Sequence, residues 1–196
     1  MNHLSYHELL EIIEAAVTTT PPMELSFHLA FPDRRYYHLM YLLSQRLAPC
    51  VALELGVERG DGLASLALGS PETRVLGVDY DFHKLLPATL AEFPDITFLN
   101  TRSTPVPEEL RGIEIDILHV DTVHSYNQVT SEWQEYEPLL AQGAAVLFDD
   151  LHANDDGVAQ KFYELPHPKR QDDRLHLGCG YGVLLYCKEQ RQWIER

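Results

Sequence analysis

The chain has 196 residues, of which 45% are hydrophobic, and its formal net charge is -15 with a sequence pI ≈ 4.9. This length and hydrophobic content suit one sizeable core. A surface of this sign repels phosphate backbones and anionic lipid, so neither nucleic acid nor a membrane surface is expected as a partner.

Cysteine usage and the N-terminal residues bear on the compartment. The three cysteines, Cys50, Cys179 and Cys187, are odd in number and lack CxxC spacing, which indicates neither a disulfide framework nor a zinc site. The first residues carry histidines and glutamates where a signal peptide would have a basic start and an apolar centre. The sequence also has no apolar run near the ~20 residues that span a bilayer. A cytoplasmic location is therefore expected.

The first 49 residues predict two helices. Apolar residues at helical spacing predict an amphipathic first helix that ends at residues 18–22: Leu9, Ile12, Ile13, Ala16 and Val17. A second helix is predicted from Asp33, as its N-cap, to Pro49. Residues 27–41, which include the start of the second predicted helix, are rich in aromatic residues. Their side chains either pack on the core or form a lid or substrate wall.

From Cys50 onward, short apolar runs alternate with helical patterns. Strands are predicted at residues 51–55, 74–78, 96–99, 115–120 and 145–148, and helical segments at 60–68, 82–92, 107–111 and 125–141. Strands and helices in strict succession imply right-handed crossovers. We therefore predict an α/β, Rossmann-like fold, a mostly parallel sheet with helices on both faces.

The last third of the chain predicts a change of strand direction. A helix is expected near residues 156–163, followed by a polar loop and apolar segments at 174–177 and 183–187. The short glycine-rich connection between those segments, residues 178–182, permits an antiparallel pair, so the last strand should be antiparallel. The domain organisation predicted is a helical extension, 1–49, serving as a lid or oligomer contact, and a Rossmann domain, 50–196.

Acidic residues follow most of the predicted strands. In an open parallel sheet, ligands bind beyond the carboxyl ends of the strands. The acids that reach this edge are Glu54, Asp79, Asp81, Asp121, Asp149 and Asp150, whereas the third strand ends in residues 100–103, Asn-Thr-Arg-Ser. Such a site suits hydroxyls, ammonium groups, a sulfonium or a divalent cation.

The glycines after the first strand are spaced GxxxGxG, at Gly56, Gly60 and Gly62. This differs from the GxGxxG pattern that brings a helix N-terminus against the phosphates of a dinucleotide. Glycine at this turn still permits close approach of the backbone to a ligand. A nicotinamide-dependent oxidoreductase on the same fold is therefore a weaker alternative, which fold alone does not exclude.

Residues 51–62, Val-Ala-Leu-Glu-Leu-Gly-Val-Glu-Arg-Gly-Asp-Gly, and residues 75–79, Val-Leu-Gly-Val-Asp, carry a resemblance. They resemble the first two motifs of class I S-adenosylmethionine-dependent methyltransferases, and the resemblance covers roughly residues 50 to 187. It implies that Gly56 and Gly60 line the cofactor, that Asp79 holds the ribose hydroxyls and that Glu54 lies near the amino group. In relatives an acid usually follows the third strand near the adenine. Here Arg102 departs from that pattern, and only Ser103 is carried over.

Residues 121–126, Asp-Thr-Val-His-Ser-Tyr, and 148–150, Phe-Asp-Asp, narrow the resemblance. They look like the metal-dependent O-methyltransferases that include the macrolide sugar and cephalosporin-type enzymes. That subset implies Mg²⁺ held by Asp121, Asp149 and Asp150, with His124 as the base. Asp121 is assigned to the cofactor as well. The subset often has Glu or His where this chain has Asp149.

The residue chemistry supports the same assignment. Mg²⁺ prefers hard oxygen ligands and keeps positions for water or substrate, and a coordinated hydroxyl has a lowered pKa. His124, with an ordinary pKa near ~6.5, is suited to accept the proton. Ser125 and Gln128 match a capping box, which would begin a helix at Ser125 and leave His124 in the loop before it.

Four further features are expected to be structural. His119 lies within a strand and should be buried, and Tyr126 should pack. His152 is interpreted as a bystander, with a metal ligand or a base as the alternatives. A basic island, His167, Lys169 and Arg170, is interpreted as a solvated loop, with a substrate-anion contact or a lid as the alternative.

We therefore predict a Mg²⁺-assisted, S-adenosylmethionine-dependent O-methyltransferase of a small polyhydroxylated molecule, such as a natural-product sugar or a vicinal diol. The alternative is a non-catalytic partner protein on a methyltransferase scaffold, which Arg102 favours. The expected partner is a small-molecule substrate, and the aromatic N-terminal segment offers a surface for a homo-oligomer.

Overall fold

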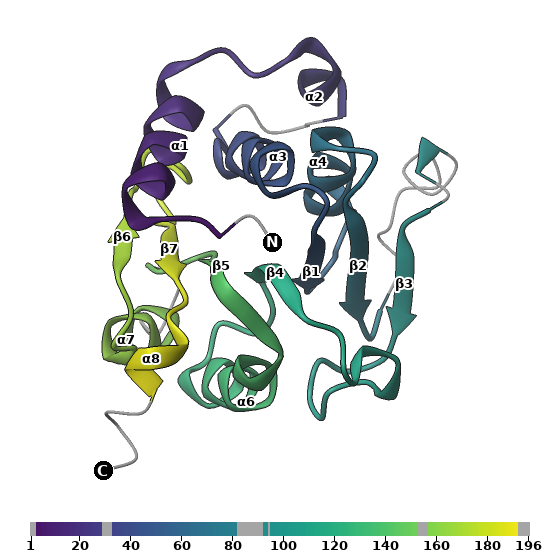
Figure 1. Cartoon of the computed structure of the whole chain (residues 1–196), viewed down its shortest axis with the longest axis vertical. Helices are drawn as coiled ribbons and strands as arrows, with labels where there is room; N and C mark the ends of the chain where they lie inside the picture. Colours follow the sequence, from purple (N-terminus) through teal and green to yellow (C-terminus); the bar gives the residue numbers. More distant parts are fainter. Residues whose placement is uncertain (1–2, 29–32, 82–91, 94, 153–156, 192–196) are drawn as a thin grey trace.

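A seven-stranded sheet in the order β3-β2-β1-β4-β5-β7-β6 forms the centre of the computed structural model (Figure 1). The residues described are 3–28, 33–81, 92–93, 95–152 and 157–191. The strands are β1 Val51–Leu55, β2 Arg74–Asp79, β3 Thr97–Asn100, β4 Ile115–Val120, β5 Leu140–Phe148, β6 Lys169–Gln171 and β7 Gly182–Leu185. Strand β7 is antiparallel to both neighbours, whereas β1 to β5 are parallel. The predicted Rossmann-like fold with an antiparallel last strand is confirmed.

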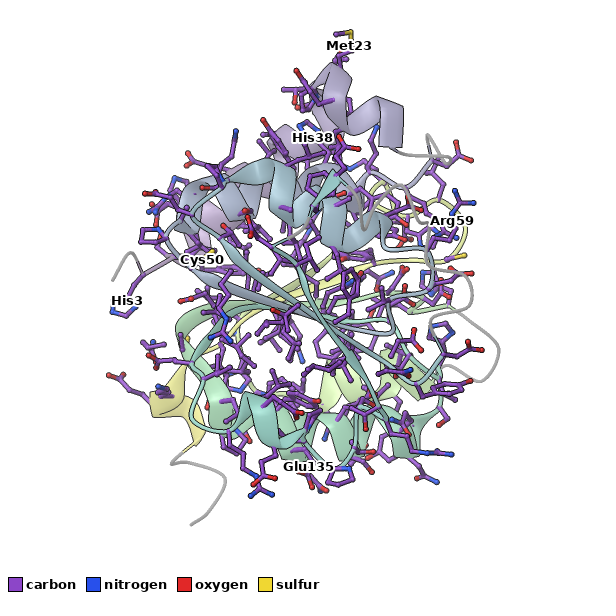
Figure 2. The ribbon with its side chains drawn as sticks, turned by 90° about the vertical axis from the view of Figure 1, so that its right-hand side faces the viewer. His3, Met23, His38, Cys50, Arg59 and Glu135 are labelled. Atoms are coloured by element: carbon purple, nitrogen blue, oxygen red, sulfur yellow. The ribbon has the colours of Figure 1, made fainter. Side chains whose placement is uncertain are left out.

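Helices cover both faces of the sheet (Figure 1). On one face lie α1 Tyr6–Thr18, α2 Met23–His28, α3 Tyr36–Leu47 and α4 Asp61–Gly69; on the other lie α6 Tyr126–Tyr136, α7 Gly157–Glu164 and α8 Lys188–Arg191. Figure 2 shows His38 of α3 and Glu135 of α6 in the two opposite layers. Each face has its own cluster of buried apolar side chains, because alternate residues of the buried strands point to opposite faces.

The N-terminal helices share the apolar cluster of the first face. Helix α1 begins with a capping box. The Ser5 side chain accepts the backbone N–H of Glu8, and the Glu8 side chain accepts the backbone N–H of Ser5. Leu9 of α1 and Leu43 of α3 are buried in the same cluster as Ala52 of β1. Helices α1 and α3 therefore share one apolar core with the sheet.

The predicted start of the second helix was wrong. Helix α3 begins at Tyr36, after Arg35, and no side chain caps it. Asp33 lies in a turn, and Arg34 pairs with His176 in an isolated antiparallel bridge. Because this long-range bridge involves the backbone of Arg34, the N-cap is Arg35 and the helix starts two residues later than an N-cap at Asp33 would place it.

The boundary between α6 and β5 also differs from the prediction. A helix was expected to continue to Ala141, but α6 ends at Tyr136 and a short 3₁₀ turn, η3 Glu137–Leu139, follows. Pro138 lies in that turn, and because proline has no backbone N–H it cannot donate the hydrogen bond that would continue the α-helix. Strand β5 consequently starts at Leu140 and not at Ala145, with a register irregularity against β4.

The C-terminal hairpin uses a different partner from the one predicted. Residues 174–177 form turns and a single bridge position, and β6, Lys169–Gln171, pairs with β7. The basic island is therefore not a solvated loop. His167 is 4% exposed, and the Lys169 ammonium donates to three backbone carbonyls at the end of α7.

The other expected elements follow the prediction closely. Strands β1 and β4 have the predicted bounds, and the predicted turn at 107–111 contains the 3₁₀ helix η2 Glu108–Leu110. The helix expected at 82–92 lies almost entirely outside the described residues. Across the described part of the chain, no helix is both long and apolar enough to cross a bilayer.

Candidate active site

Two adjoining cavities lie at the carboxyl ends of the parallel strands. The first has a volume of ≈ 320 Å³ and the second ≈ 300 Å³. Gly56, Glu58, Asp79, Asp121 and Thr122 line both, so the cavities are two ends of one cleft. This is the edge where the acids were predicted to gather.

Different side chains line each end of the cleft. The first cavity, called the β2–β3 end, is completed by Val78, Tyr80, Asp81, Arg102, Ser103, Thr104, Val123 and Gln128. The second, called the β4–β5 end, is completed by Arg34, His124, Asp149, Asp150 and His176. Of the predicted site residues, Ser103 lines only the β2–β3 end, whereas Asp149 and Asp150 line only the β4–β5 end. Gly56, Asp79 and Asp121 line both ends.

Gly56, in the glycine turn after β1, lines both ends of the cleft. Gly56 has φ +84° and Gly60, the N-cap of α4, has φ +86°, a backbone region that favours glycine. A Cβ on Gly62 would lie 2.0 Å from a carboxylate oxygen of Glu54. The predicted glycines are therefore required by the turn and by the close packing beneath it.

Asp79 holds that turn from the neighbouring strand. Its Oδ2 accepts hydrogen bonds from the backbone N–H of Val57 at 2.8 Å and of Glu58 at 3.2 Å, and its Oδ1 accepts from Asp81. The carboxylate is partly exposed and lines both cavities. The acid predicted to bind ribose hydroxyls therefore faces the cleft at a fixed position.

Glu54 is placed differently, below the cleft. It is 3% exposed, lines neither cavity and pairs with His119 across β1 and β4, with Oε1 at 2.9 Å from Nδ1. Burial raises the pKa of Glu54, and the contact with His119 opposes this. Burial alone would lower the pKa of His119, but the Glu54 carboxylate raises it. The expected burial of His119 is confirmed.

A buried carboxylate on α6 organises the β2–β3 end. Glu132 is 1% exposed and accepts hydrogen bonds from the hydroxyls of Ser103 and Thr122 and from the Gln128 amide. Burial raises the pKa of Glu132, against the effect of these donors. Ser103 was predicted at this place, whereas Glu132 was not. Gln128 uses its side chain in this network, so only the Ser125 half of the predicted capping box forms.

His124 lies between two carboxylates at the β4–β5 end. Its Nε2 is 3.3 Å from Asp121 Oδ1 and its Nδ1 is 3.4 Å from Asp150 Oδ2. The hydrogen bond to Asp121 raises the pKa of His124 most, burial opposes this, and the charge of Asp150 adds to it. The two acids therefore stabilise the protonated form that results when His124 accepts a proton. As predicted, it lies just before α6.

Asp149 and Asp121 occupy contrasting environments. Asp149 is 2% exposed and its Oδ1 accepts from His176 Nδ1 at 2.6 Å. Burial would raise the pKa of Asp149, but the His176 contact outweighs it and the pKa is lowered. Burial raises the pKa of Asp121, and the Asp149 charge reinforces this despite the hydrogen bond with His124. Perturbed pKa values in a cleft mark a candidate functional site.

The described residues offer three groups that could hold a cation, each with ligand atoms within 4.8 Å of one another. They are Asp121, His124 and Asp150; His119, Asp121 and Asp149; and Asp150, His176 and Cys179. None of these contains all three acids predicted as metal ligands. The three predicted acids therefore lie at the same edge of the sheet, but they belong to different, overlapping groups. Each of these groups also includes a nitrogen or sulfur ligand atom.

Two residues of the β4–β5 end were missed by sequence reasoning. Arg34 and His176 line this cavity, and a backbone bridge joins them although they are far apart in the chain. Arg34 also donates to the hydroxyls of Tyr36 and Tyr37. Neither residue lies in a local motif, so the sequence offered no pattern that would have identified them.

A sheet in this order, with a glycine turn after β1 and an acid after β2 facing one cleft, defines the class I methyltransferase fold. A family described as "Methyltransferase domain" matches residues 53–151, half of the 196-residue chain. The chain belongs to this family, the S-adenosylmethionine-dependent class that its motifs resembled.

Individual relatives agree with this placement. A rhamnosyl O-methyltransferase of Mycobacterium leprae (strain TN) is 29% identical over 133 residues, 62% of this chain and 57% of the relative. The chain thus spans less than two thirds of that relative's length.

Solved structures share the fold. The O-methyltransferase TomG of Streptomyces achromogenes, in complex with SAM, has a TM-score of 0.65 at 17% identity, covering 91% of this chain and 96% of its own. An O-methyltransferase from Bacillus cereus in complex with SAH has a TM-score of 0.63 at 17% identity, covering 90% of this chain and 89% of its own. A TDP-rhamnose 3'-O-methyltransferase of calicheamicin biosynthesis has a TM-score of 0.59 at 19% identity, covering 94% of this chain and 96% of its own.

Proposed function

We propose that this chain transfers a methyl group from S-adenosylmethionine to a hydroxyl of a small polyhydroxylated molecule, a natural-product sugar or a vicinal diol, with the assistance of Mg²⁺. The observation that carries this proposal is the position of His124, between Asp121 and Asp150 at one end of the cleft. The names of the rhamnosyl and TDP-rhamnose relatives support a sugar as the substrate class.

The β2–β3 end of the cleft fits the cofactor. Asp79 offers carboxylate oxygens for the ribose hydroxyls of the cofactor. The Ser103–Gln128–Glu132 network supplies polar groups for its adenine ring. Arg102 lines this end where relatives usually have an acid. The buried acid of this region is instead Glu132 on α6, which accepts a hydrogen bond from the neighbouring Ser103. The methionine part would then pass Gly56 toward the junction at Asp121.

The donor set at the β4–β5 end fits Mg²⁺. Three carboxylates, Asp121, Asp149 and Asp150, face one cavity, and hard oxygen atoms are the ligands that Mg²⁺ prefers. The Oδ1 atom of Asp150 is buried and, among the described residues, makes no hydrogen bond. When bound, Mg²⁺ would lower the pKa of a substrate hydroxyl and fix its orientation.

The chain's own residues then carry the proton. His124, neutral before reaction, takes the proton of the substrate hydroxyl as the oxygen attacks the methyl carbon of the sulfonium. The new O–C bond forms while the C–S bond breaks, and its electron pair returns to sulfur. The products are a methyl ether and S-adenosylhomocysteine, and His124 passes its proton to solvent. Asp121 and Asp150 stabilise the imidazolium formed in this step.

The test is methyl transfer from labelled S-adenosylmethionine to a panel of deoxyhexoses with adjacent hydroxyls, free and as glycosides or nucleoside diphosphates. Transfer should stop with EDTA and return with Mg²⁺. Asp150→Asn should abolish transfer yet leave the calorimetric Kd of the cofactor near the wild-type value, because Asp150 lines only the β4–β5 end.

The matched control is Asp173→Asn, a change at an exposed acid outside both cavities. It should leave both readouts unchanged. Activity that is indifferent to the chelator would remove Mg²⁺ from the proposal. A chain that binds neither S-adenosylmethionine nor S-adenosylhomocysteine would overturn it entirely.

A further inference from the structure

A buried histidine with one unused nitrogen lies beneath the β4–β5 end. His119 is on β4 and is fully buried, at 0% exposed. Its Nδ1 contacts Glu54 at 2.9 Å. Among the described residues, its Nε2 has no hydrogen-bond partner, and the same holds for Glu54 Oε2 and the Tyr181 hydroxyl. Three such atoms in one region are unusual, because buried polar groups in proteins are nearly always satisfied.

The contact with Glu54 determines which nitrogen is available. A carboxylate accepts hydrogen bonds, so Nδ1 carries the proton and the lone pair of the neutral ring is on Nε2. Histidines that bind metals commonly donate their other ring N–H to a carboxylate, which fixes the tautomer and the ring orientation. The rings of Tyr36 and Tyr181, which stack on each other, lie near the imidazole, with centroids 5.8 and 6.0 Å from it.

Two carboxylates complete the group. One ligand atom each from His119, Asp121 and Asp149 lie within 4.8 Å of one another. His119 and Asp121 are two residues apart at the end of β4. Asp149 is two residues beyond Leu147, the partner of His119 on β5, so strand alternation places all three on the same face. Asp121 and Asp149 also line the β4–β5 end of the cleft.

From this arrangement we infer that Nε2 of His119 is a nitrogen ligand of the divalent cation that Asp121 and Asp149 hold. One imidazole with two carboxylates suits a transition-series cation such as Mn²⁺ better than Mg²⁺, which prefers oxygen alone. The inference rests on the proposed function insofar as that function places a cation at this edge. It changes the class of the preferred cation and adds a ligand from the strand interior.

The experiment uses the whole chain loaded with Mn²⁺ alone. Electron spin-echo envelope modulation detects ¹⁴N coupling when an imidazole nitrogen binds Mn²⁺ directly. Coupling is expected in the wild type, is expected to persist in the double variant His124→Gln/His176→Gln and is expected to be lost in His119→Gln. Glu54→Gln should keep the coupling but raise the Kd for Mn²⁺ by about 10–100-fold, as loss of a carboxylate behind a histidine ligand does.

Each outcome decides the inference. Bound Mn²⁺ without ¹⁴N coupling in the wild type, or loss of coupling in the double variant, overturns it, and Nε2 then holds only a buried water. The double variant gives this answer even where His119→Gln fails to fold. Neither result touches the proposed function, because Mn²⁺ is still bound. Absence of any Mn²⁺ binding, with transfer insensitive to EDTA, would remove the metal from both.

Discussion

A Cβ atom on Gly56 would lie 1.9 Å from the carbonyl oxygen of Asp121, so the turn after β1 touches the residue that follows β4. Only a residue without a side chain allows this approach, and the φ of +84° at Gly56 independently favours glycine. The two halves of the cleft therefore meet at a backbone contact, and the position of Asp121 depends on that contact.

Gly56→Ala should therefore damage both stability and binding. We expect a loss of at least about 3 kcal/mol in the free energy of unfolding, because backbone strain alone costs about 1–3 kcal/mol and the clash adds to it. The affinity for S-adenosylmethionine should fall with it. Gly112→Ala is the control: Gly112 has φ +79°, and a Cβ at this position would meet no atom within 4 Å. Equal losses in urea unfolding for the two variants would show that the contact with Asp121 is unimportant.

His124→Gln should separate catalysis from cofactor binding. Loss of the proton acceptor should lower kcat by about 10²–10⁴-fold. The Kd of S-adenosylmethionine should stay near the wild-type value, because His124 lines only the β4–β5 end. His152→Gln removes a histidine that contacts Asp173 at 3.2 Å and lines neither cavity, and it should retain activity. A kcat for His124→Gln within threefold of the wild type would exclude His124 as the base.

Glu132→Ala should weaken cofactor binding although Glu132 lines neither cavity. It leaves the donors of Ser103, Thr122 and Gln128 without their acceptor, at a cost of about 1–3 kcal/mol for each group that stays unsatisfied. We expect a KM for S-adenosylmethionine at least about tenfold higher, with a smaller change in kcat.

Two further variants distinguish this role from a general loss of stability. Glu132→Gln retains an acceptor of the same size and should recover most of the affinity. Glu135→Gln removes a charge from an exposed position on the same helix and should leave KM unchanged (Figure 2). A rise in KM that simply follows thermal stability across these variants would contradict a positioning role for Glu132.

His167 should make the fold sensitive to mild acid. Burial, with a contribution from Lys169, lowers the pKa of His167 to about 4, and its Nδ1 accepts the backbone N–H of Cys187. The unfolded chain, with a histidine pKa near ~6.5, binds a proton that the folded chain does not between about pH 6.5 and 4. The free energy of unfolding should therefore decrease as the pH falls through this range.

The measurement is urea unfolding at pH 7.5 and pH 5. We expect His167 to account for a decrease on the order of 1–2 kcal/mol between these values. His167→Asn keeps an acceptor near the Nδ1 position and should remove that part of the pH dependence. His7→Asn, at an exposed histidine, should unfold with the wild-type dependence on pH. Identical slopes for the wild type and His167→Asn would contradict the assignment.

The sequence predicted best those parts of the fold where local pattern and tertiary packing agree. Strands β1 and β4 are short, mostly apolar segments that are almost fully buried, and both have the predicted bounds. Ser125 likewise caps α6 and leaves His124 before the helix. These features depend on side chains a few residues apart, which periodicity and capping rules describe well.

The errors arose where distant contacts decide the backbone. Arg34 forms a backbone bridge with His176, and this distant pairing overrode the N-cap pattern at Asp33. Strand β6 forms from polar residues because β7 offers it a free edge, a property of the sheet and not of residues 169–171. The same limitation hid Glu132, whose helical position indicated only a surface residue.

The bridge between Arg34 and His176, together with the hydrogen bond from the backbone N–H of Tyr36 to the Leu175 carbonyl at 3.0 Å, affects the order in which the cleft is assembled. Chains emerge from the ribosome N-terminus first. The glycine turn and Asp79 are made early, whereas the β4–β5 end needs residue 176 to dock beside residue 34. A nascent chain therefore has all the residues of the β2–β3 end of the cleft before the last hairpin completes the β4–β5 end.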